Sequence, residues 1–250
     1  MATRLQFDKR HYRSVGSTND IARNLADEGC FEGVVVTADE QIQGRGRTGA
    51  SWSSPVGNLY QSLVLRPKVS PSIAGQLSFV TSLALHQAIT SLLPEQDCLC
   101  KWPNDVLCDG AKIAGILLES KLHPSGSLNW IIIGMGVNVA HKPSEAPYRV
   151  VKVNELTGGA SISTDELHSE FLRAFAALYA SWLDFGFSGI RRLWLERAKG
   201  LGQPVRVRLP KEERHGLFGG IDENGALVLQ YGDGTEDLIS AGAVFYDLED

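Results

Sequence analysis

The chain has 250 residues, of which 43% are hydrophobic and 21% charged, and its formal net charge is −5. This composition is typical of a soluble protein with one large domain and a small one, and the acidity argues against a general nucleic-acid binder. The start, MATRLQFDKRHYRSV, is too polar for a secretory signal, and no apolar run approaches the roughly 20 residues that span a bilayer. We therefore expect a cytoplasmic protein without a membrane anchor.

Four cysteines are present, at Cys30, Cys98, Cys100 and Cys108. Cys98 and Cys100 share one face of an expected strand, but they lack the C-x-x-C spacing of a zinc-binding turn. Because no secretion signal is present, we expect the cysteines to be free thiols, buried or half-exposed.

At the N-terminal end we expect a strand over residues 5–15 and then a helix that ends at Gly29. The helix begins at Ser17-Thr18-Asn19, where Ser17 or Thr18 can serve as its cap. Two interpretations of these small polar residues remain open. They could only cap the helix, or they could hydrogen-bond an amide-like ligand.

A buried strand over residues 34–37 leads into QIQGRGRTGASWSSPVGNLY, residues 41–60. Closely spaced glycines turn successive N–H groups to one side, and Arg45 and Arg47 can grip a carboxylate or phosphate. Trp52 could stack on a flat ring. No Asp or Glu occurs over residues 41–94, so the local field is positive and indicates a bound anion. The stretch matches neither a P-loop nor a dinucleotide fingerprint, and alone it could equally be a mobile surface loop or a nucleic-acid-binding arm.

The middle of the chain predicts a strand over 59–65 and one long helix over 71–93, in which His86 is expected to be packed rather than a ligand. A short strand over 98–102 should turn at KWPND, with Lys101 and Asn104 near its exit. A hairpin over 106–118 follows. Lys112 in its second strand has two interpretations: its ammonium group reaches the strand edge, or it points at a bound polar group.

A core strand over 130–138 contains Gly134 and Gly136, which indicate close approach by a ligand or another backbone, and Asn138 at its end is a candidate polar contact. A capping box at 163–166 begins an amphipathic helix with an aromatic core stripe, and another helix is expected over 187–199. The residues after 200 predict short strands joined by tight turns, including Asn224-Gly225, and hence a small barrel.

The polar segments contain the motifs GSTN, GRGR-x-G-x-x-W, KWPND, K-x-AGIL-E and G-x-G-x-N. With these motifs in this order, the chain resembles the biotin protein ligases. The resemblance covers most of the chain, and KWPND followed by AKIAGILLE is its most specific part. It implies an α+β fold: a mixed β-sheet packed with helices over residues 1–200, and an SH3-like C-terminal β-barrel over residues 201–250. The chain resembles the form without the N-terminal DNA-binding domain, so no DNA partner is expected.

The resemblance also implies which residues meet each substrate. The positions matching those that hold biotin are Ser17, Thr18, Asn19, Gln41, Arg45, Gly46, Arg47, Lys112, Gly134 and Gly136. The positions matching those around ATP or the adenylate are Trp52, Lys101, Asn104 and Asn138. Arg47, Lys101 and Lys112 would supply the catalytic charge, and the glycine loop would act as a lid. Several relatives carry a basic residue where this chain has Ala50, so the lid could close less tightly.

The chemistry implied by the resemblance has two steps. The carboxylate of biotin attacks the α-phosphate of ATP, which gives biotinyl-adenylate and pyrophosphate. A lysine of a biotin carboxyl carrier protein domain then attacks the activated carbonyl, which gives an amide and AMP. Mg²⁺ is expected on the phosphates, held largely by substrate oxygens and water rather than by a protein metal site. A homodimer is possible, because dimers are common in the family.

Two alternatives remain at this stage. A lipoate or octanoate ligase or transferase would share the fold, although the GRGR loop, KWPND and the terminal barrel together favour biotin. A non-catalytic binding module is the other, and it leaves Lys101, Lys112 and the arginine pair without a purpose.

Overall fold

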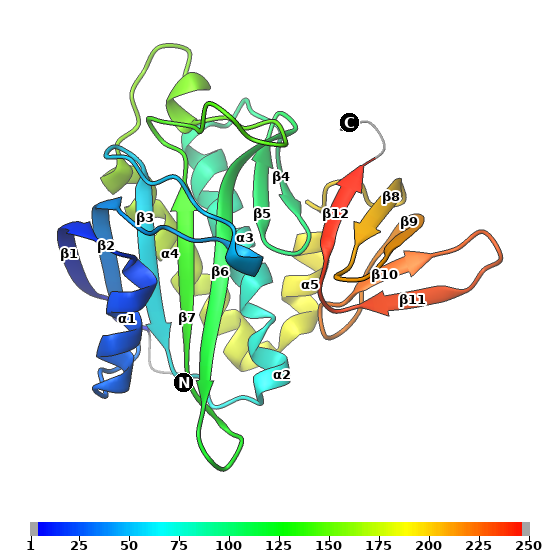
Figure 1. The fold of residues 1–250 in the computed structure, drawn as a ribbon, viewed down its shortest axis with the longest axis horizontal. Coiled ribbons are helices and arrows are strands. Elements are labelled where there is room, and N and C mark those ends of the chain that lie inside the picture. The colour runs from blue at the N-terminus through cyan, green and yellow to red at the C-terminus, as the bar shows by residue number, and fades with distance from the viewer. Residues whose placement is uncertain (1–4, 247–250) are drawn as a thin grey trace.

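A seven-stranded sheet forms the centre of the structure, a computed structural model that describes residues 5–246. The strands are β1 (Asp8–Val15), β2 (Val34–Gln41), β3 (Leu59–Leu65), β4 (Cys98–Lys101), β5 (Asp105–Cys108), β6 (Ala111–Leu122) and β7 (Leu128–Val137). Their order is β1-β2-β3-β7-β6-β5-β4, in which only the β1–β2 pair is parallel. The predicted mixed sheet is therefore confirmed, with β7 at its middle (Figure 1).

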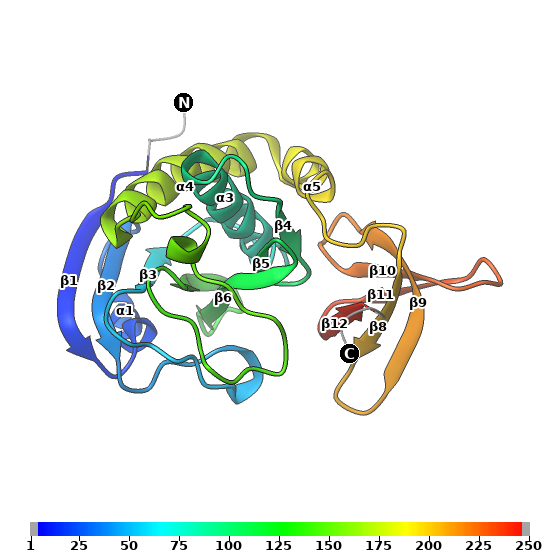
Figure 2. The ribbon, with the colours of Figure 1, turned by 90° about the horizontal axis from the view of Figure 1, so that it is seen from above.

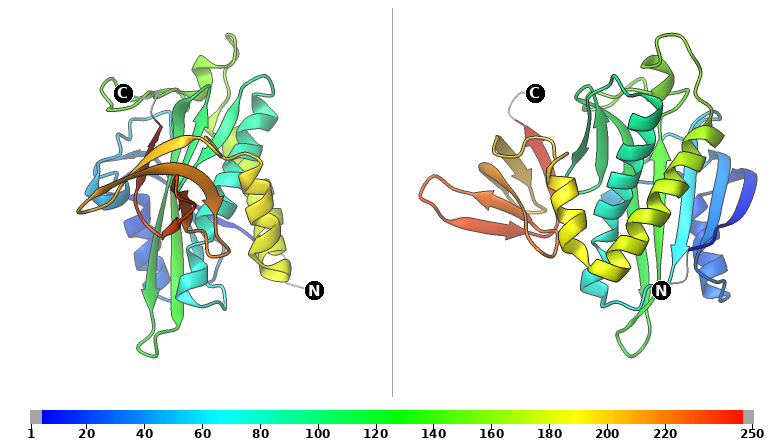
Figure 3. Two further views of the ribbon diagram at one scale, coloured as in Figure 1. Left: turned by 90° about the vertical axis from the view of Figure 1, so that its right-hand side faces the viewer. Right: turned by 180° about the vertical axis from the view of Figure 1, so that it is seen from behind.

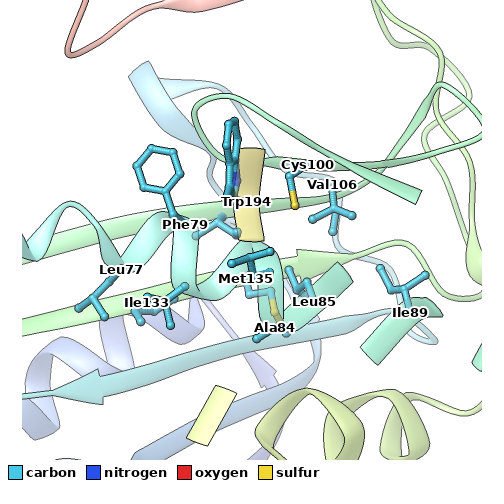
Figure 4. Close-up of a cluster of buried hydrophobic side chains, with 14 of the residues drawn as sticks. Leu77, Phe79, Ala84, Leu85, Ile89, Cys100, Val106, Ile133, Met135 and Trp194 are labelled. Atoms are coloured by element: carbon cyan, nitrogen blue, oxygen red, sulfur yellow. The ribbon is translucent and has the colours of Figure 1, made fainter. Parts of the chain in front are cut away.

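Helices cover the two faces of this sheet unequally. α1 (Thr18–Asp27) packs on one face, against β2, β3 and β7, whereas α3 (Leu77–Leu92), α4 (Thr164–Phe185) and α5 (Phe187–Leu195) lie on the other side (Figures 2 and 3). The large core between α3 and the sheet includes Leu85, Ile133 and Met135 (Figure 4). The smaller core under α1 includes Trp130 and Ile132. Successive residues of β7 alternate between the two cores, as a strand's period of two requires.

Helical boundaries differ from the prediction in two places. The single helix expected over 71–93 is divided into α2 (Pro71–Ala74) and α3. Around Gly75 and Gln76 the backbone bonds run three residues back, from Gln76 to Ile73 and from Ser78 to Gly75, which tightens the chain between the helices. The helix expected over 187–199 ends at Leu195, because the following residues bond instead to the β4 edge through both backbone groups of Cys100.

Two helix starts were predicted from capping residues, with different outcomes. At α4 the capping box is present, since Ser163 and Glu166 each bond to the other's backbone N–H. At α1 Ser17 occupies the cap position but makes no side-chain capping bond, so simple capping does not account for the polar residues there.

The C-terminal part forms a separate five-stranded antiparallel sheet, of β8 (Pro204–Arg208), β9 (Glu213–Ile221), β10 (Leu227–Gln230), β11 (Glu236–Ile239) and β12 (Ala243–Tyr246). The order is β11-β10-β9-β8-β12, and no ladder joins β11 to β12 within residues 5–246, so the small barrel is not closed by hydrogen bonds. The predicted Asn224-Gly225 turn joins β9 to β10 and docks on the main sheet, where Trp102 Nε1 donates to the Gly225 carbonyl at 3.1 Å.

The prediction of free thiols is wrong for two cysteines. Cys98 and Cys108 form a disulfide, because the antiparallel register of β4 and β5 places them opposite each other with Cα atoms 4.1 Å apart. Cys30 and Cys100 are free, and burial raises the pKa of the Cys100 thiol to about 12. Across residues 5–246, no helix has the length and apolarity to cross a bilayer.

Candidate active site

A cavity of about 620 Å³ opens on the α1 face of the seven-stranded sheet, beside the C-terminal half of β7. It is lined by the start of α1, the glycine-rich loop between β2 and β3, β6, and the turns of the C-terminal sheet. The residues predicted from sequence that line it are Ser17, Thr18, Asn19, Gln41, Arg45, Gly46, Arg47, Trp52, Asn104, Lys112, Gly134 and Gly136. Segments far apart in sequence therefore converge on one site.

The glycines of β7 let other segments come close to the strand. Gly134 and Gly136 continue the face that Trp130 and Ile132 occupy farther along β7. A Cβ atom on Gly134 would lie 2.3 Å from Asn19 Oδ1, and one on Gly136 would lie 2.5 Å from the Trp52 indole. Any side chain here would displace the start of α1 or the glycine-rich loop, which explains the two glycines that the sequence singled out.

The start of α1 is tied to neighbouring strands by a buried polar network. The Thr18 N–H and hydroxyl donate to Gln41 Oε1 at 2.9 and 3.1 Å, and Gln41 Nε2 donates to Ser54 Oγ at 3.0 Å. The Ser62 hydroxyl lies within hydrogen-bonding distance of both Thr18 and Asn19. The network holds the helix start rigid, which is the preorganisation that a binding site needs.

Two buried donors of the cavity wall have no hydrogen-bond partner within the described residues. They are Asn19 Nδ2 and Trp52 Nε1. Buried polar groups in folded proteins are almost always paired, so each orphan calls for an explanation. Because both residues line the cavity, a ligand with hydrogen-bond acceptors would satisfy them.

The glycine-rich loop folds back on itself as a tight hairpin. Gly46 N–H donates to the Ala50 carbonyl at 2.7 Å, and Trp52 N–H donates to the Gly44 carbonyl at 2.9 Å. The tip at η1 (Arg47–Gly49) has Thr48 and Gly49 at φ of 53° and 80°. Glycine adopts this left-handed conformation without steric cost, which suits it to the tip.

The two arginines of the loop differ in their partners. Arg45 donates through both terminal nitrogens to the Asp20 carboxylate, at 2.9 and 2.6 Å. Arg47 donates to Asn104 Oδ1 at 3.0 Å and to the Gly242 carbonyl at 3.4 Å, and no carboxylate of residues 5–246 forms an ion pair with it. Burial lowers the pKa of Arg47. The charge of the nearby Asp105 partly offsets this effect of burial on the pKa. Because no carboxylate of residues 5–246 is in direct contact with it, Arg47 is suited to a bound anion.

Lys112 also lines the cavity. Its Nζ is 2.8 Å from Asp105 Oδ1, and 5.5 and 5.2 Å from the ring centres of Trp52 and Tyr148. Asp105 therefore forms an ion pair with Lys112. A cation held by one carboxylate and two aromatic faces is oriented yet keeps donors for a ligand.

Lys101 and Asn138 do not line the cavity. Lys101 Nζ lies 5.3 Å from the ring centre of Tyr246 in the C-terminal sheet. Asn138 is buried, and its Nδ2 donates to the Val151 carbonyl at 3.1 Å, which fastens the loop after β7. The structure thus separates these two positions from the other predicted contacts, and their assignment to the adenylate stays a prediction.

Several residues of the site had no assignment from sequence. Asp20 and Glu119 surround Arg45, Ser54 and Ser62 complete the polar network, and Tyr148 faces Lys112. The C-terminal sheet adds Arg208, Leu209, Pro210, Ala241, Gly242 and Ala243 to the cavity wall. Of these residues, only Asp20 could have been suggested by the sequence, because it directly follows the polar residues at the start of α1. No local pattern reports contacts between the two sheets.

No group of three or more His, Cys, Asp or Glu side chains within residues 5–246 could hold a metal ion. The cations of the cavity wall are Arg45, Arg47, Lys112 and Arg208. Arg45 and Arg208 form ion pairs with Asp20 and Glu213, outside the cavity lining.

Comparisons with known proteins agree with this geometry. The family described as "Biotin/lipoate A/B protein ligase family" matches residues 12–138, and "Biotin protein ligase C terminal domain" matches residues 200–246. The biotin–[acetyl-CoA-carboxylase] ligase of Paracoccus denitrificans is 41% identical, over 92% of this chain and 97% of that protein. The bifunctional ligase/repressor BirA of Bacillus subtilis is 32% identical, over 91% of this chain and 70% of that protein.

Solved structures give the same result. The biotin protein ligase from Aquifex aeolicus in complex with biotin and ATP superposes with a TM-score of 0.82 at 26% identity, over 96% of this chain and 99% of that chain. From these matches along nearly the whole sequence, the chain belongs to the biotin/lipoate A/B protein ligase family and, within it, to the biotin protein ligases.

Proposed function

We propose that this cavity joins biotin to ATP and then passes biotin to a lysine of a biotin carboxyl carrier protein domain, of the acetyl-CoA carboxylase type. The observation that carries the proposal is the convergence of Arg47 and Lys112, from separate segments, on one cavity that also contains the unpartnered donors of Asn19 and Trp52. The Paracoccus denitrificans relative is named for this reaction, and the Aquifex aeolicus structure contains both small substrates.

The first step brings two anions together. The biotin carboxylate must approach the α-phosphate of ATP, and their repulsion is strong in a partly dry cavity unless cations lie between them. Arg47 and Lys112 supply that charge, and they stabilise the charge that develops on the α-phosphate as pyrophosphate leaves. Because Asn104 and Asp105 already orient the two side chains, little reorganisation is needed when the substrates meet.

The polar start of α1 suits the uncharged end of biotin. Ser17, Thr18 and Asn19 are each only 3% exposed, and the Asn19 amide keeps a free donor. Gln41, Gly46, Gly134 and Gly136 complete that wall, with the glycines of β7 leaving room for Asn19 and Trp52 to approach the strand. Trp52 and Asn104 lie toward the adenylate. Lys101 is the third catalytic cation of the proposal, although it would have to act from outside the cavity wall.

In the second step the carrier lysine attacks the carbonyl of the mixed anhydride, and AMP leaves. The adenylate is already an activated acyl group, so no nucleophilic side chain of the enzyme is required. Mg²⁺ would accompany ATP as part of the substrate, held by phosphate oxygens and water, and would supply positive charge to the phosphates. Because ATP and the carrier are both substrates, we place the reaction in the cytoplasm.

The first half-reaction gives a direct test, because it needs no carrier. The protein with biotin, ATP and Mg²⁺ should release pyrophosphate and accumulate biotinyl-adenylate, detected by mass spectrometry of the small molecules. Lipoate and octanoate serve as matched controls in the same assay and in thermal melts, since only a ligand that binds the folded state stabilises it. Pyrophosphate release with lipoate but not with biotin would overturn the choice of substrate, and release with none of them would overturn the activity.

A further inference from the structure

A ring of four charged side chains surrounds the outer edge of the glycine-rich loop. Arg45 from the loop contacts Asp20 of α1 and Glu119 of β6, and Arg23 of α1 contacts the same two carboxylates. Two guanidinium groups and two carboxylates balance each other. Three separate elements are thereby joined at one point beside the cavity.

The geometry of the ring is specific. The Arg45 fork binds both oxygens of Asp20, and its Nε and Nη2 lie 3.4 Å from Glu119 Oε1. Arg23 reaches Asp20 Oδ1 at 2.8 Å and Glu119 Oε2 at 2.7 Å. Hydrogen bonding from Arg45 also holds the pKa of Asp20 below its ordinary value. Paired, two-point contacts of this kind fix orientation as well as charge.

We infer that Arg45 is a positioning residue whose side chain latches the glycine-rich loop to α1 and β6 through Asp20 and Glu119. The fork of Arg45, which the family resemblance assigns to biotin, is occupied by carboxylates of the protein itself. Arg47 keeps its charge for the substrates. The two arginines of the GRGR motif therefore have different roles. Arg45 holds the loop in place, and Arg47 contacts the bound anion.

The latch controls how easily the cavity opens. The loop carries Gly46, Arg47 and Trp52 of the cavity wall, so its release would expose bound adenylate to water. The four side chains are 23–38% exposed, so solvent screens their attraction and the latch can open reversibly. Its consequence for adenylate rests on the proposed function, whereas its effect on the loop does not.

Limited trypsin digestion without ligand tests the latch directly, because trypsin cuts after Arg45 and Arg47. Asp20→Asn and Glu119→Gln keep the shape of each side chain but remove its charge. Loop cleavage should rise roughly five- to tenfold in each variant, as expected for the loss of a partly exposed, two-point charge contact. High salt should raise cleavage of the wild-type loop and change the variants little.

Asp27→Asn is the matched control, because Asp27 lies on the same helix and pairs with Lys121 and Trp130, away from the loop. Loop cleavage in Asp20→Asn and Glu119→Gln equal to that in Asp27→Asn would overturn the inference. So would faster cleavage spread evenly over the whole chain with a lower melting temperature, because that indicates general destabilisation. Two independent variants keep the test valid if one of them does not fold.

A double-variant cycle separates the latch from a direct substrate contact. In the latch account, Asp20→Asn adds little to the loss caused by Arg45→Gln, because both break one interaction. In Asp20→Asn, release of adenylate without a carrier should rise by the same roughly five- to tenfold, and kcat for adenylate formation should stay nearly unchanged. Independent, additive losses in biotin affinity would show that Arg45 contacts biotin and would overturn the inference. A chain without ligase activity could still show the cleavage result, so the two proposals fail separately.

Discussion

Gly134→Ala perturbs the closest approach in the site. The new Cβ would lie 2.3 Å from Asn19 Oδ1 and 2.9 Å from its Cγ and Nδ2, a separation that real Cβ atoms do not show. Asn19 is 3% exposed and bonds to Ser62, so it cannot move aside without breaking that contact. Either the start of α1 shifts away from β7, or the Asn19 side chain turns into the cavity.

The cost follows from these contacts. Forcing a methyl group into a packed site costs about 1–3 kcal/mol, and leaving a buried hydrogen-bond partner unsatisfied costs about 1–3 kcal/mol more. The sum, about 2–6 kcal/mol, lowers the melting temperature by roughly 4–24 °C for a chain of this size. Biotin affinity should fall with it, because the displaced side chain lies where the ligand would bind.

Gly189→Ala is the control for this prediction. Gly189 lies inside α5 with no atom within 4 Å of an added Cβ, so alanine should leave the chain as stable or more stable, by about 0.5–1 kcal/mol. Thermal melts and calorimetric titration with biotin measure both effects. If Gly134→Ala has the same melting temperature as the Gly189→Ala control and binds biotin as tightly as the wild type does, then the position of Asn19 does not require a glycine at 134. That result would refute the reasoning.

Three further predictions concern single side chains. Lys112→Ala should weaken biotin binding at least about tenfold, the loss of one charge-assisted contact, while circular dichroism stays unchanged; full affinity in titration calorimetry would reject its role. Burial lowers the pKa of His168 to about 4, so the unfolded chain binds that proton first and stability falls as pH drops from about 6.5 toward 4. Urea denaturation gives the free energy of unfolding at pH 7 and at pH 5, and His168→Gln should reduce the difference between the two by about 2 kcal/mol. The same difference in wild type and variant would contradict this prediction. Alkylation under denaturing, non-reducing conditions should label Cys30 and Cys100 but not Cys98 or Cys108, and labelling of all four would argue against the disulfide.

Much of the fold could be predicted because local patterns agreed with the tertiary structure. A continuous apolar run identified β7, the capping box identified α4, and Asn224-Gly225 identified a hairpin of the second sheet. The errors arose where distant partners decided the outcome. The residues after Leu195 leave the helix to bond the edge of β4, a partner about one hundred residues earlier in the chain.

The cysteine error has a related cause. Whether Cys98 faces Cys108 depends on the β4–β5 register. The sequence predicted the turn at KWPND and the hairpin after Cys108, and both are present, but it did not predict this register. Composition and the missing secretion signal favoured free thiols, but neither reports which cysteines lie opposite each other. Once the strands pair across the short KWPND turn, the two thiols are brought together.

The candidate site was also predicted well where local motifs were sufficient and poorly where distant partners decided the outcome. The sequence motifs located the cavity wall contributed by α1, the glycine-rich loop, β6 and β7, because glycines and small polar residues have distinct physical uses there. They did not locate Tyr148 or the part contributed by the C-terminal sheet. They could not separate the roles of Arg45 and Arg47, since the separation comes from Asp20 and Glu119 on other elements. They also could not place Lys101 outside the cavity or bring Gly242 of the second sheet to Arg47.

The most direct measurement is the intact mass of a carrier domain after incubation with the protein, biotin, ATP and Mg²⁺. The carrier should gain the mass of one biotinyl group on its acceptor lysine, and Lys112→Ala should slow that gain strongly at equal protein concentration. A carrier that stays unmodified, or that Lys112→Ala modifies as fast as the wild type does, would contradict the claim that these converging cations join the vitamin to the nucleotide.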